Sequence, residues 1–114
     1  MDADTTGILA GRRILVTGGS KGIGAAIVRA LHRDGAEVVV HFGADAAAAA
    51  ELLVQLGGRV HPVGADLGEP GAADRLWAEA KDRLGGIDAL IANAGAWIGS
   101  PLADVQEWDA GWEA

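Results

Sequence analysis

The sequence contains neither cysteine nor tyrosine, and lysine occurs only at Lys21 and Lys81. The absence of cysteine excludes disulfide bridges, zinc–thiolate sites and thiol nucleophiles, and it fits a reducing cytoplasm. Tyrosine is one of the side chains that transfer protons in enzymes, so its absence also narrows the possible chemistry. Histidine, aspartate and glutamate do not cluster at the spacing that metal ligands need, and we predict no metal site.

Positive charge is scarce, with 9 basic residues against 16 acidic ones and a formal net charge of -7 at pH 7. A chain of this sign repels the phosphates of nucleic acids and lacks the basic residues that attract anionic membranes, so we expect neither partner. No apolar run approaches the roughly 18 residues that a membrane-spanning helix needs. The acidic amino-terminal segment lacks the features of a signal peptide. We therefore predict a cytoplasmic protein.

Hydrophobic residues make up 50% of the chain, which is enough for the core of one domain. We predict a single dinucleotide-binding domain over residues 1–114, with residues 1–10 as a flexible lead-in. Short apolar segments alternate with amphipathic ones, and this order predicts an α/β fold whose parallel sheet carries helices on both faces. Pro62 indicates that the third strand lies at an edge. We expect strands at 13–17, 38–42, 59–63 and 87–92. A glycine-rich loop at 18–24 leads into the first helix, which ends at residue 33, and further helices are expected at 44–56, 69–84 and 104–114.

Three glycines, Gly18, Gly22 and Gly24, separate the first predicted strand from the first predicted helix. A helix that starts directly after a strand presents backbone N–H groups that, together with the helix dipole, bind anions such as pyrophosphate. In such a loop the first glycine permits the tight turn, the second lets phosphates approach the backbone, and the third lets the helix pack close to the strands. The spacing G-x-x-x-G-x-G is neither the G-x-G-x-x-G fingerprint nor a P-loop. An ordinary glycine-rich turn is the alternative.

Two further polar segments follow predicted strands directly, Asp66-Leu67 after the third and Asn93-Ala94-Gly95 after the fourth. Ligands of open α/β sheets bind at the carboxyl ends of the strands, where the glycine-rich loop also lies. Asp66 alone could be a helix cap, and Asn93 alone could be a turn residue. Three such segments at one edge of the sheet together predict a binding site.

These segments resemble the amino-terminal half of the short-chain dehydrogenase/reductase family, through Thr17-Gly18-Gly19-Ser20-Lys21-Gly22-Ile23-Gly24, Asp66-Leu67 and Asn93-Ala94-Gly95. The resemblance implies a Rossmann-type sheet in the order 3-2-1-4, incomplete relative to the full family fold, and a nicotinamide dinucleotide as cofactor. It also implies that Asp66 meets the adenine, that Asn93 braces the fourth strand, and that Ala94 and Gly95 line the cofactor groove. The cofactor-binding residues predicted in this way are Gly18, Ser20, Lys21, Gly22, Ile23, Gly24, His41, Asp66, Leu67, Asn93, Ala94 and Gly95.

The choice between NAD and NADP depends on the end of the second strand, where an NAD site usually carries an acid that binds the ribose hydroxyls. Here His41 follows Val40, so no acid stands at that position. The resemblance implies that Lys21, just before Gly22, pairs with a 2′-phosphate, although a solvated loop lysine is the alternative. Asp45 would repel that phosphate, but it fits better as the cap of the second helix. We predict NADP(H) in preference to NAD(H).

Catalytic residues are not expected within this chain. The family uses a Tyr-x-x-x-Lys pair, an upstream Ser and an Asn from the fourth helix to handle the substrate. The chain has no Tyr, and its only serines are Ser20 and Ser100, of which Ser100 precedes Pro101 as a turn residue. The sequence therefore looks like a chain truncated before the catalytic Ser and the Tyr-x-x-x-Lys pair.

The predicted function is the NADP(H)-binding half of an oxidoreductase that interconverts a carbonyl and an alcohol by hydride transfer. A non-catalytic nucleotide-binding or regulatory module and one half of a split enzyme are the alternatives, and no substrate is predicted. The fourth strand, interior in a complete family member, would here be an apolar edge that invites association. We therefore expect a homo-oligomer, or self-association through this strand and through Trp108 and Trp112.

Overall fold

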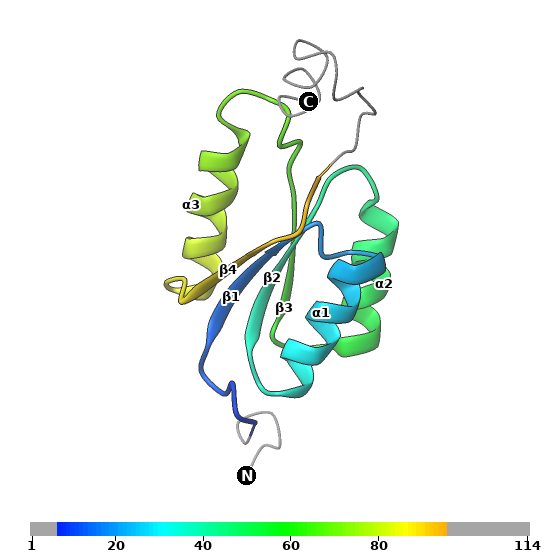
Figure 1. The fold of residues 1–114 in the computed structure, drawn as a ribbon, viewed down its shortest axis with the longest axis vertical. Helices are drawn as coiled ribbons and strands as arrows, with labels where there is room; N and C mark the ends of the chain where they lie inside the picture. Colours follow the sequence, from blue (N-terminus) through cyan, green and yellow to red (C-terminus); the bar gives the residue numbers. More distant parts are fainter. Residues whose placement is uncertain (1–6, 96–114) are drawn as a thin grey trace, which may run out of the picture.

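The computed structural model describes residues 7–95 of the chain. Its elements are β1 (Arg13–Thr17), α1 (Gly22–Arg33), β2 (Glu37–Phe42), α2 (Ala46–Leu56), β3 (Val60–Gly64), α3 (Ala72–Leu84) and β4 (Ala89–Ala92). The four strands form one parallel sheet in the order β3-β2-β1-β4, with α1 and α2 on one face and α3 on the other (Figure 1). This confirms the predicted Rossmann-type sheet and its order. The helix predicted at 104–114, with Trp108 and Trp112, lies outside the described residues.

Both faces of the sheet are buried over β1 and β2, as the continuous apolar strands predict, whereas β4 is largely exposed. Successive residues of β1 and β2 point to opposite faces, so each strand contributes to two hydrophobic layers. The layer under α1 and α2 consists of Ile14, Val16, Val28, Ala36, Val38, Val40, Leu52 and Val60. The layer under α3 consists of Leu15, Val39, Val63, Leu76, Ala80 and Leu84.

The first helix begins earlier than predicted, at Gly22, so that the second and third glycines of the loop belong to its first turn. It ends at Arg33 as predicted, and the N–H of the C-cap residue Asp34 donates to the carbonyl of Ala30 at 3.1 Å. The carbonyl of Asp34 accepts the N–H of Leu9 at 2.7 Å. The part of the amino-terminal lead-in that the structure describes, from Gly7 on, is therefore attached to the end of α1.

The third helix begins three residues later than predicted, at Ala72 instead of Glu69. Gly71 has the left-handed conformation, with φ 78°, and this conformation cannot continue into a right-handed helix. Trp77, whose spacing suggests the buried face, is 45% exposed. The side chains that α3 does bury are Ala72, Leu76, Ala80 and Leu84.

Smaller differences affect the other element ends. β3 starts at Val60 because Arg59 has φ 73°, which lies outside the extended region. Among the described strands it pairs only with β2, so the edge position predicted from its proline is confirmed. β4 starts at Ala89, two residues later than predicted. The N-cap of α2 is as predicted, since the Asp45 carboxylate accepts the N–H of Ala48 at 2.9 Å.

The first turn of α1 approaches the end of β1 so closely that only glycine fits. A Cβ atom on Gly24 would collide with the carbonyl oxygen of Gly18 and would lie 2.8 Å from Nδ2 of Asn93. Gly24 is buried in this contact. The third glycine of the loop therefore has the packing role predicted for it, and the start of α1 is held against the strand ends.

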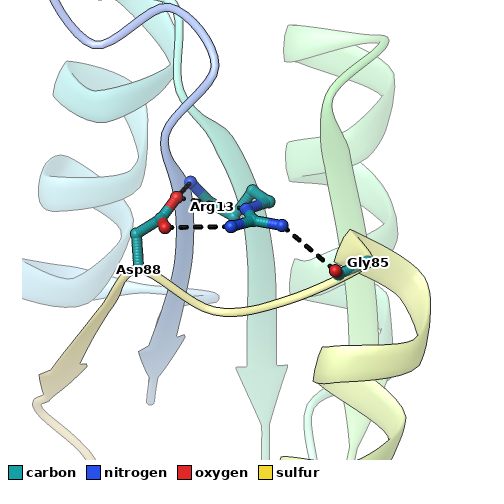
Figure 2. A network of polar contacts seen from close by, with 3 residues as sticks. All are labelled: Arg13, Gly85 and Asp88. Carbon is teal, nitrogen blue, oxygen red and sulfur yellow. Dashed lines mark hydrogen bonds and ion pairs between the residues drawn. The ribbon is translucent and has the colours of Figure 1, made fainter.

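At the opposite end of the sheet, Asp88 joins the start of β1 to the turn between α3 and β4 (Figure 2). Oδ2 of Asp88 accepts the backbone N–H of Arg13 at 2.9 Å and its Nε–H at 3.1 Å, and Oδ1 accepts from Nη2 at 3.0 Å. Nη1 of Arg13 donates to the Gly85 carbonyl at 3.0 Å. These bonds, first from the side chain of Arg13 and then from its backbone, lower the pKa of Asp88 to about 2.

Replacing Asp88 with Asn is expected to destabilise the domain at neutral pH, because charge-assisted hydrogen bonds to Arg13 are lost. The pKa of Asp88 falls from 3.8 to about 2 on folding. Its carboxylate therefore stabilises the fold fully above the higher value, and this contribution disappears as the pH falls toward the lower one. Urea denaturation of wild type and of Asp88→Asn measures the free energy of unfolding of each protein. The difference between the two free energies should be constant near neutral pH and should shrink in acid.

The control for this comparison is Asp82→Asn, which neutralises an exposed carboxylate on α3. Its free energy of unfolding should follow the wild type at every pH. If Asp82→Asn and Asp88→Asn lose the same stability, the bonds between Arg13 and Asp88 do not hold this end of the sheet.

Replacing Gly24 with Ala is expected to lower the free energy of unfolding by about 3 kcal/mol, because overpacking against backbone forces α1 away from β1. Gly43→Ala is the matched control, since a Cβ atom there meets nothing within 4 Å. The control should change the stability by less than about 1 kcal/mol. Chemical denaturation of Gly24→Ala and Gly43→Ala measures both free energies of unfolding. Equal stabilities would contradict the close contact between Gly24 and the Gly18 carbonyl.

Candidate functional site

The carboxyl ends of all four strands lie at one edge of the sheet, because the strands are parallel. Two adjoining hollows of about 560 Å³ each lie there. They share the lining residues Gly18, Gly43, Ala44, Ala94 and Gly95. The first hollow is completed by Ser20, Lys21, Asp45 and Asn93. The second is completed by His41, Ala65, Asp66, Leu67 and Gly68.

Most of the predicted cofactor-binding residues line these two hollows, and the exceptions lie in the first turn of α1. Gly22 instead lines a smaller hollow of about 240 Å³, together with Ser20 and Lys21. Gly24 is buried against β1, so its role is packing. Ile23 lines none of these three hollows, and it is 75% exposed.

Gly18 is the point at which the strand ends are joined. Its backbone has φ 62°, and a Cβ atom there would lie 2.9 Å from Cα of Ala94. The Gly18 N–H donates to Nδ1 of His41 at 3.0 Å, and its carbonyl accepts from Nδ2 of Asn93 at 3.1 Å. Side chains from β2 and from the segment after β4 therefore hold the two sides of this glycine.

Thr17, the last residue of β1, was not among the predicted site residues. Its Oγ1 accepts the backbone N–H of Asn93 at 3.0 Å and of Ala94 at 3.1 Å. These bonds tie the segment after β4 to the end of β1, and the Asn93 side chain adds the bond to Gly18. The signal in the sequence was a hydroxyl at the end of an otherwise apolar run.

His41 was predicted near the cofactor, and the structure buries it beneath the glycine loop with 3% of its surface exposed. Nδ1 accepts from Gly18, and Nε2 lies 2.8 Å from the carbonyl oxygen of Ala65. The backbone carbonyl of His41 also accepts the N–H of Gly19 at 2.9 Å. Its polar atoms thus form hydrogen bonds with the loops after β1 and β3.

Lys21 and Asp45 face each other across the first hollow, with Nζ 3.5 Å from Oδ2. The lysine side chain is 73% exposed and the aspartate side chain 41%. The N–H of Ala48, and to a smaller extent Lys21, hold the pKa of Asp45 below its ordinary value, so Asp45 is negatively charged at neutral pH. Because solvent screens an exposed ion pair, this contact is weak, and Lys21 can readily exchange Asp45 for another anion.

The amino-terminal end of α1 fits an anionic ligand. No side chain caps it, and its first turn carries no acidic residue. Gly22 has φ 62° with no atom within 4 Å of a Cβ position, so the backbone is accessible there. The start of α2 differs, since the Asp45 side chain already accepts the N–H of Ala48 there. The glycine loop therefore offers free helix dipole and N–H groups to phosphates, as a dinucleotide requires.

Asp66 lies at the end of β3, where its Oδ1 accepts the N–H of Gly68 at 2.9 Å. This turn directs the following residue, Leu67, into the second hollow, where it remains 38% exposed. Over residues 7–95, no group of three or more His, Cys, Asp or Glu side chains could hold a metal ion. The same part of the chain contains no helix that is long and apolar enough to cross a membrane.

Comparison with known proteins gives consistent matches. The family model for short chain dehydrogenases matches residues 12–114. The chain is 34% identical over 105 residues to 3beta-hydroxysteroid dehydrogenase 1 of Eggerthella lenta, covering 88% of this chain and 40% of that protein. It is 46% identical over 99 residues to 1-deoxy-11-beta-hydroxypentalenate dehydrogenase of Streptomyces arenae, covering 82% and 35% respectively.

A solved structure gives the same result. The chain matches a short chain dehydrogenase from Burkholderia cenocepacia in complex with NADP, with a TM-score of 0.79, 35% identity, and coverage of 92% of this chain and 45% of that one. The chain thus spans less than half the length of these relatives. Since the family model, the sheet order and the glycine-rich loop agree, this chain belongs to the short chain dehydrogenase family.

Proposed function

We propose that this chain binds a nicotinamide dinucleotide, with NADP(H) preferred, at the carboxyl edge of the sheet. The observation that carries the proposal is the uncapped start of α1, where Gly22 leaves the backbone accessible and the preceding Ser20 and Lys21 line the first of the two adjoining hollows. Helix dipole and backbone N–H groups there would hold the diphosphate. The relative from Burkholderia cenocepacia was solved with NADP, which supports this choice of ligand.

The hollows suggest which residues meet each part of the ligand. Asp66 and Leu67 would take the adenine, since a carboxylate and an apolar side chain lie together in the second hollow. Ala94 and Gly95 line both hollows without bulky side chains, which leaves room for the dinucleotide to run along the strand ends. Ser20 lies beside the loop, where its hydroxyl could reach a phosphate oxygen.

Lys21 supports the preference for NADP(H). Its exposed ammonium group lies at the rim of the first hollow, and a 2′-phosphate would compete there with Asp45 for the same charge. Asp45 favours the other candidate, NAD(H), because a carboxylate can accept hydrogen bonds from ribose hydroxyls and repels a phosphate. We favour NADP(H) because Asp45 is already bonded to the N–H of Ala48.

The reaction we propose is the interconversion of a carbonyl and an alcohol, for which the bound cofactor supplies or accepts a hydride. The chain contributes the cofactor-binding part of this activity. It contains no tyrosine, and hence none of the Tyr-x-x-x-Lys pair that family members use. Dehydrogenase activity therefore requires residues beyond those of this chain, and they also select the substrate.

A titration with NADPH and NADH, followed by nucleotide fluorescence, tests the proposed cofactor. Wild type should bind NADPH more tightly, and Lys21→Ala should weaken NADPH by about tenfold, since one charged contact to phosphate contributes roughly 1.5–3 kcal/mol. NADH binding should change little. The matched control is Lys81→Ala, which removes the other lysine, on α3.

Replacing Asp45 with Asn refines the same test. Asn keeps an oxygen that can cap α2, but it removes the negative charge that competes for Lys21. NADPH should bind a few times more tightly and NADH no better. Tighter binding of NADH than of NADPH by wild type would overturn the preference for NADP(H). The absence of binding of either dinucleotide would overturn the proposed function.

We also propose that the isolated chain self-associates through β4. Among the described strands, β4 pairs only with β1, and Leu90 on it is 50% exposed. Such an edge offers unpaired backbone groups and apolar side chains to a second copy. The predicted contributions of Trp108 and Trp112 remain part of this proposal.

Leu90→Lys is expected to shift the isolated chain toward monomer, because a charge on an edge strand opposes pairing. Val54→Lys is the matched control, since Val54 is an apolar residue of α2 that is 84% exposed. Sedimentation velocity at several protein concentrations measures the association. If both variants associate as wild type does, or if wild type is a monomer, β4 is not the contact.

A further inference from the structure

The contacts of His41 determine both its tautomer and its charge. Nδ1 lies 3.0 Å from the backbone nitrogen of Gly18, and Nε2 lies 2.8 Å from the carbonyl oxygen of Ala65. A backbone N–H can only donate, so Nδ1 must accept. A carbonyl oxygen can only accept, so Nε2 must carry the hydrogen. The two contacts therefore require the neutral ring with its hydrogen on Nε2.

Protonation of this ring would remove the bond to Gly18. An imidazolium carries hydrogens on both nitrogens, so two donors would face each other where a hydrogen bond now exists. The position is buried, and a buried donor without an acceptor is costly. Gly18 would have to move, and Gly19, whose N–H donates to the His41 carbonyl, belongs to the same turn.

Charged groups surround this end of the sheet on several segments, and none compensates a charge on His41. Among the described residues, no hydrogen bond or ion pair joins His41 to another side chain. Lys21 and Asp45 pair with each other at the rim of the first hollow. The carboxylate of Asp66 accepts from Gly68. Asp66 also lines a separate hollow together with Glu69, which precedes α3, and with Arg75 and Glu79 of α3. Within the strands, Glu37 contacts His61.

We propose that His41 is the positioning residue of the glycine-rich loop. In its neutral form it holds Gly18 and leaves the N–H groups at the start of α1 directed toward the hollows. When His41 is protonated, the loop is released and dinucleotide binding weakens. The part of this inference that concerns the ligand rests on the proposed function, whereas the part that concerns the loop does not.

Two substitutions distinguish the role of His41 as acceptor of the Gly18 N–H from its ability to take up a proton. In His41→Asn, Oδ1 stands the same number of bonds from Cβ as Nδ1 does in histidine, so it can accept the Gly18 N–H without taking up a proton. In His41→Val, a strand-forming side chain replaces the ring and no acceptor remains. His61→Asn is the matched control, because His61 lies on the adjacent strand β3 and contacts Glu37 instead of the loop.

The first measurement uses the chain without ligand. Nitrogen-15 NMR of the histidine rings reports the tautomer, and the amide signal of Gly18 is followed from about pH 8 to about pH 5.5. We expect His41 to have its hydrogen on Nε2 at the higher pH, and the Gly18 signal to move as the ring takes up a proton. In His41→Asn the Gly18 signal should not move, and in His61→Asn it should move as in wild type.

The second measurement is the dissociation constant for NADPH over the same pH range. The 2′-phosphate of NADPH also takes up a proton near pH 6, so the ratio of the wild-type constant to that of His41→Asn is the informative quantity. This ratio should rise as the ring takes up a proton, to on the order of tenfold for the fully protonated ring, as expected for one buried hydrogen bond lost. His41→Val should bind more weakly than His41→Asn at every pH.

The outcomes are distinguishable. A hydrogen on Nδ1, or a Gly18 signal that moves equally in wild type and His41→Asn, overturns the assignment of His41. A constant ratio of the two dissociation constants over a pH range in which the Gly18 signal moves, or equal binding by His41→Val and His41→Asn, overturns its effect on binding. If wild type binds neither dinucleotide at any pH, the proposed function is wrong, and the Gly18 signal in the ligand-free chain alone decides whether His41 positions the loop.

Discussion

The contact between the first turn of α1 and the end of β1 is the constraint on which the site depends. It is made by backbone atoms, since a side chain on Gly24 would collide with the carbonyl oxygen of Gly18. A helix held this close to a strand end leaves its amino-terminal N–H groups beside the ends of the other parallel strands. The fold thus places helix dipole, hollow and strand ends at one edge, provided that the position of Gly24 carries no side chain.

The polar contacts around Gly18 follow from the same geometry. At the end of a parallel sheet the strand ladder stops, and buried backbone groups there need other partners. Thr17 and Asn93 supply them between β1 and the segment after β4, and His41 supplies them between β1, β2 and the segment after β3. The opposite end is held separately, by the bonds between Arg13 and Asp88.

The predictions from sequence succeeded where the signal was local. Alternating apolar segments predicted the strands, the Asp45 cap was predicted from its position before an alanine-rich helix, and the glycine spacing predicted the close contact of α1. They failed where local and tertiary signals disagreed. Trp77 has the spacing of a buried face, but α3 buries Ala72, Leu76, Ala80 and Leu84 and leaves Trp77 45% exposed.

The sequence by itself determined the fold class, because that depends on periodicity along the chain, and it carried the resemblance to the family in short motifs whose residues are neighbours in the sequence. Only the tertiary structure decided which distant groups the polar side chains of the site contact. The ring of His41 lies between backbone atoms 23 and 24 positions away in the chain, and Lys21 meets Asp45 across a hollow. Such pairings depend on the register of β1, β2 and β3, which sets the atoms that face each other, and residue spacing along one segment contains no record of it.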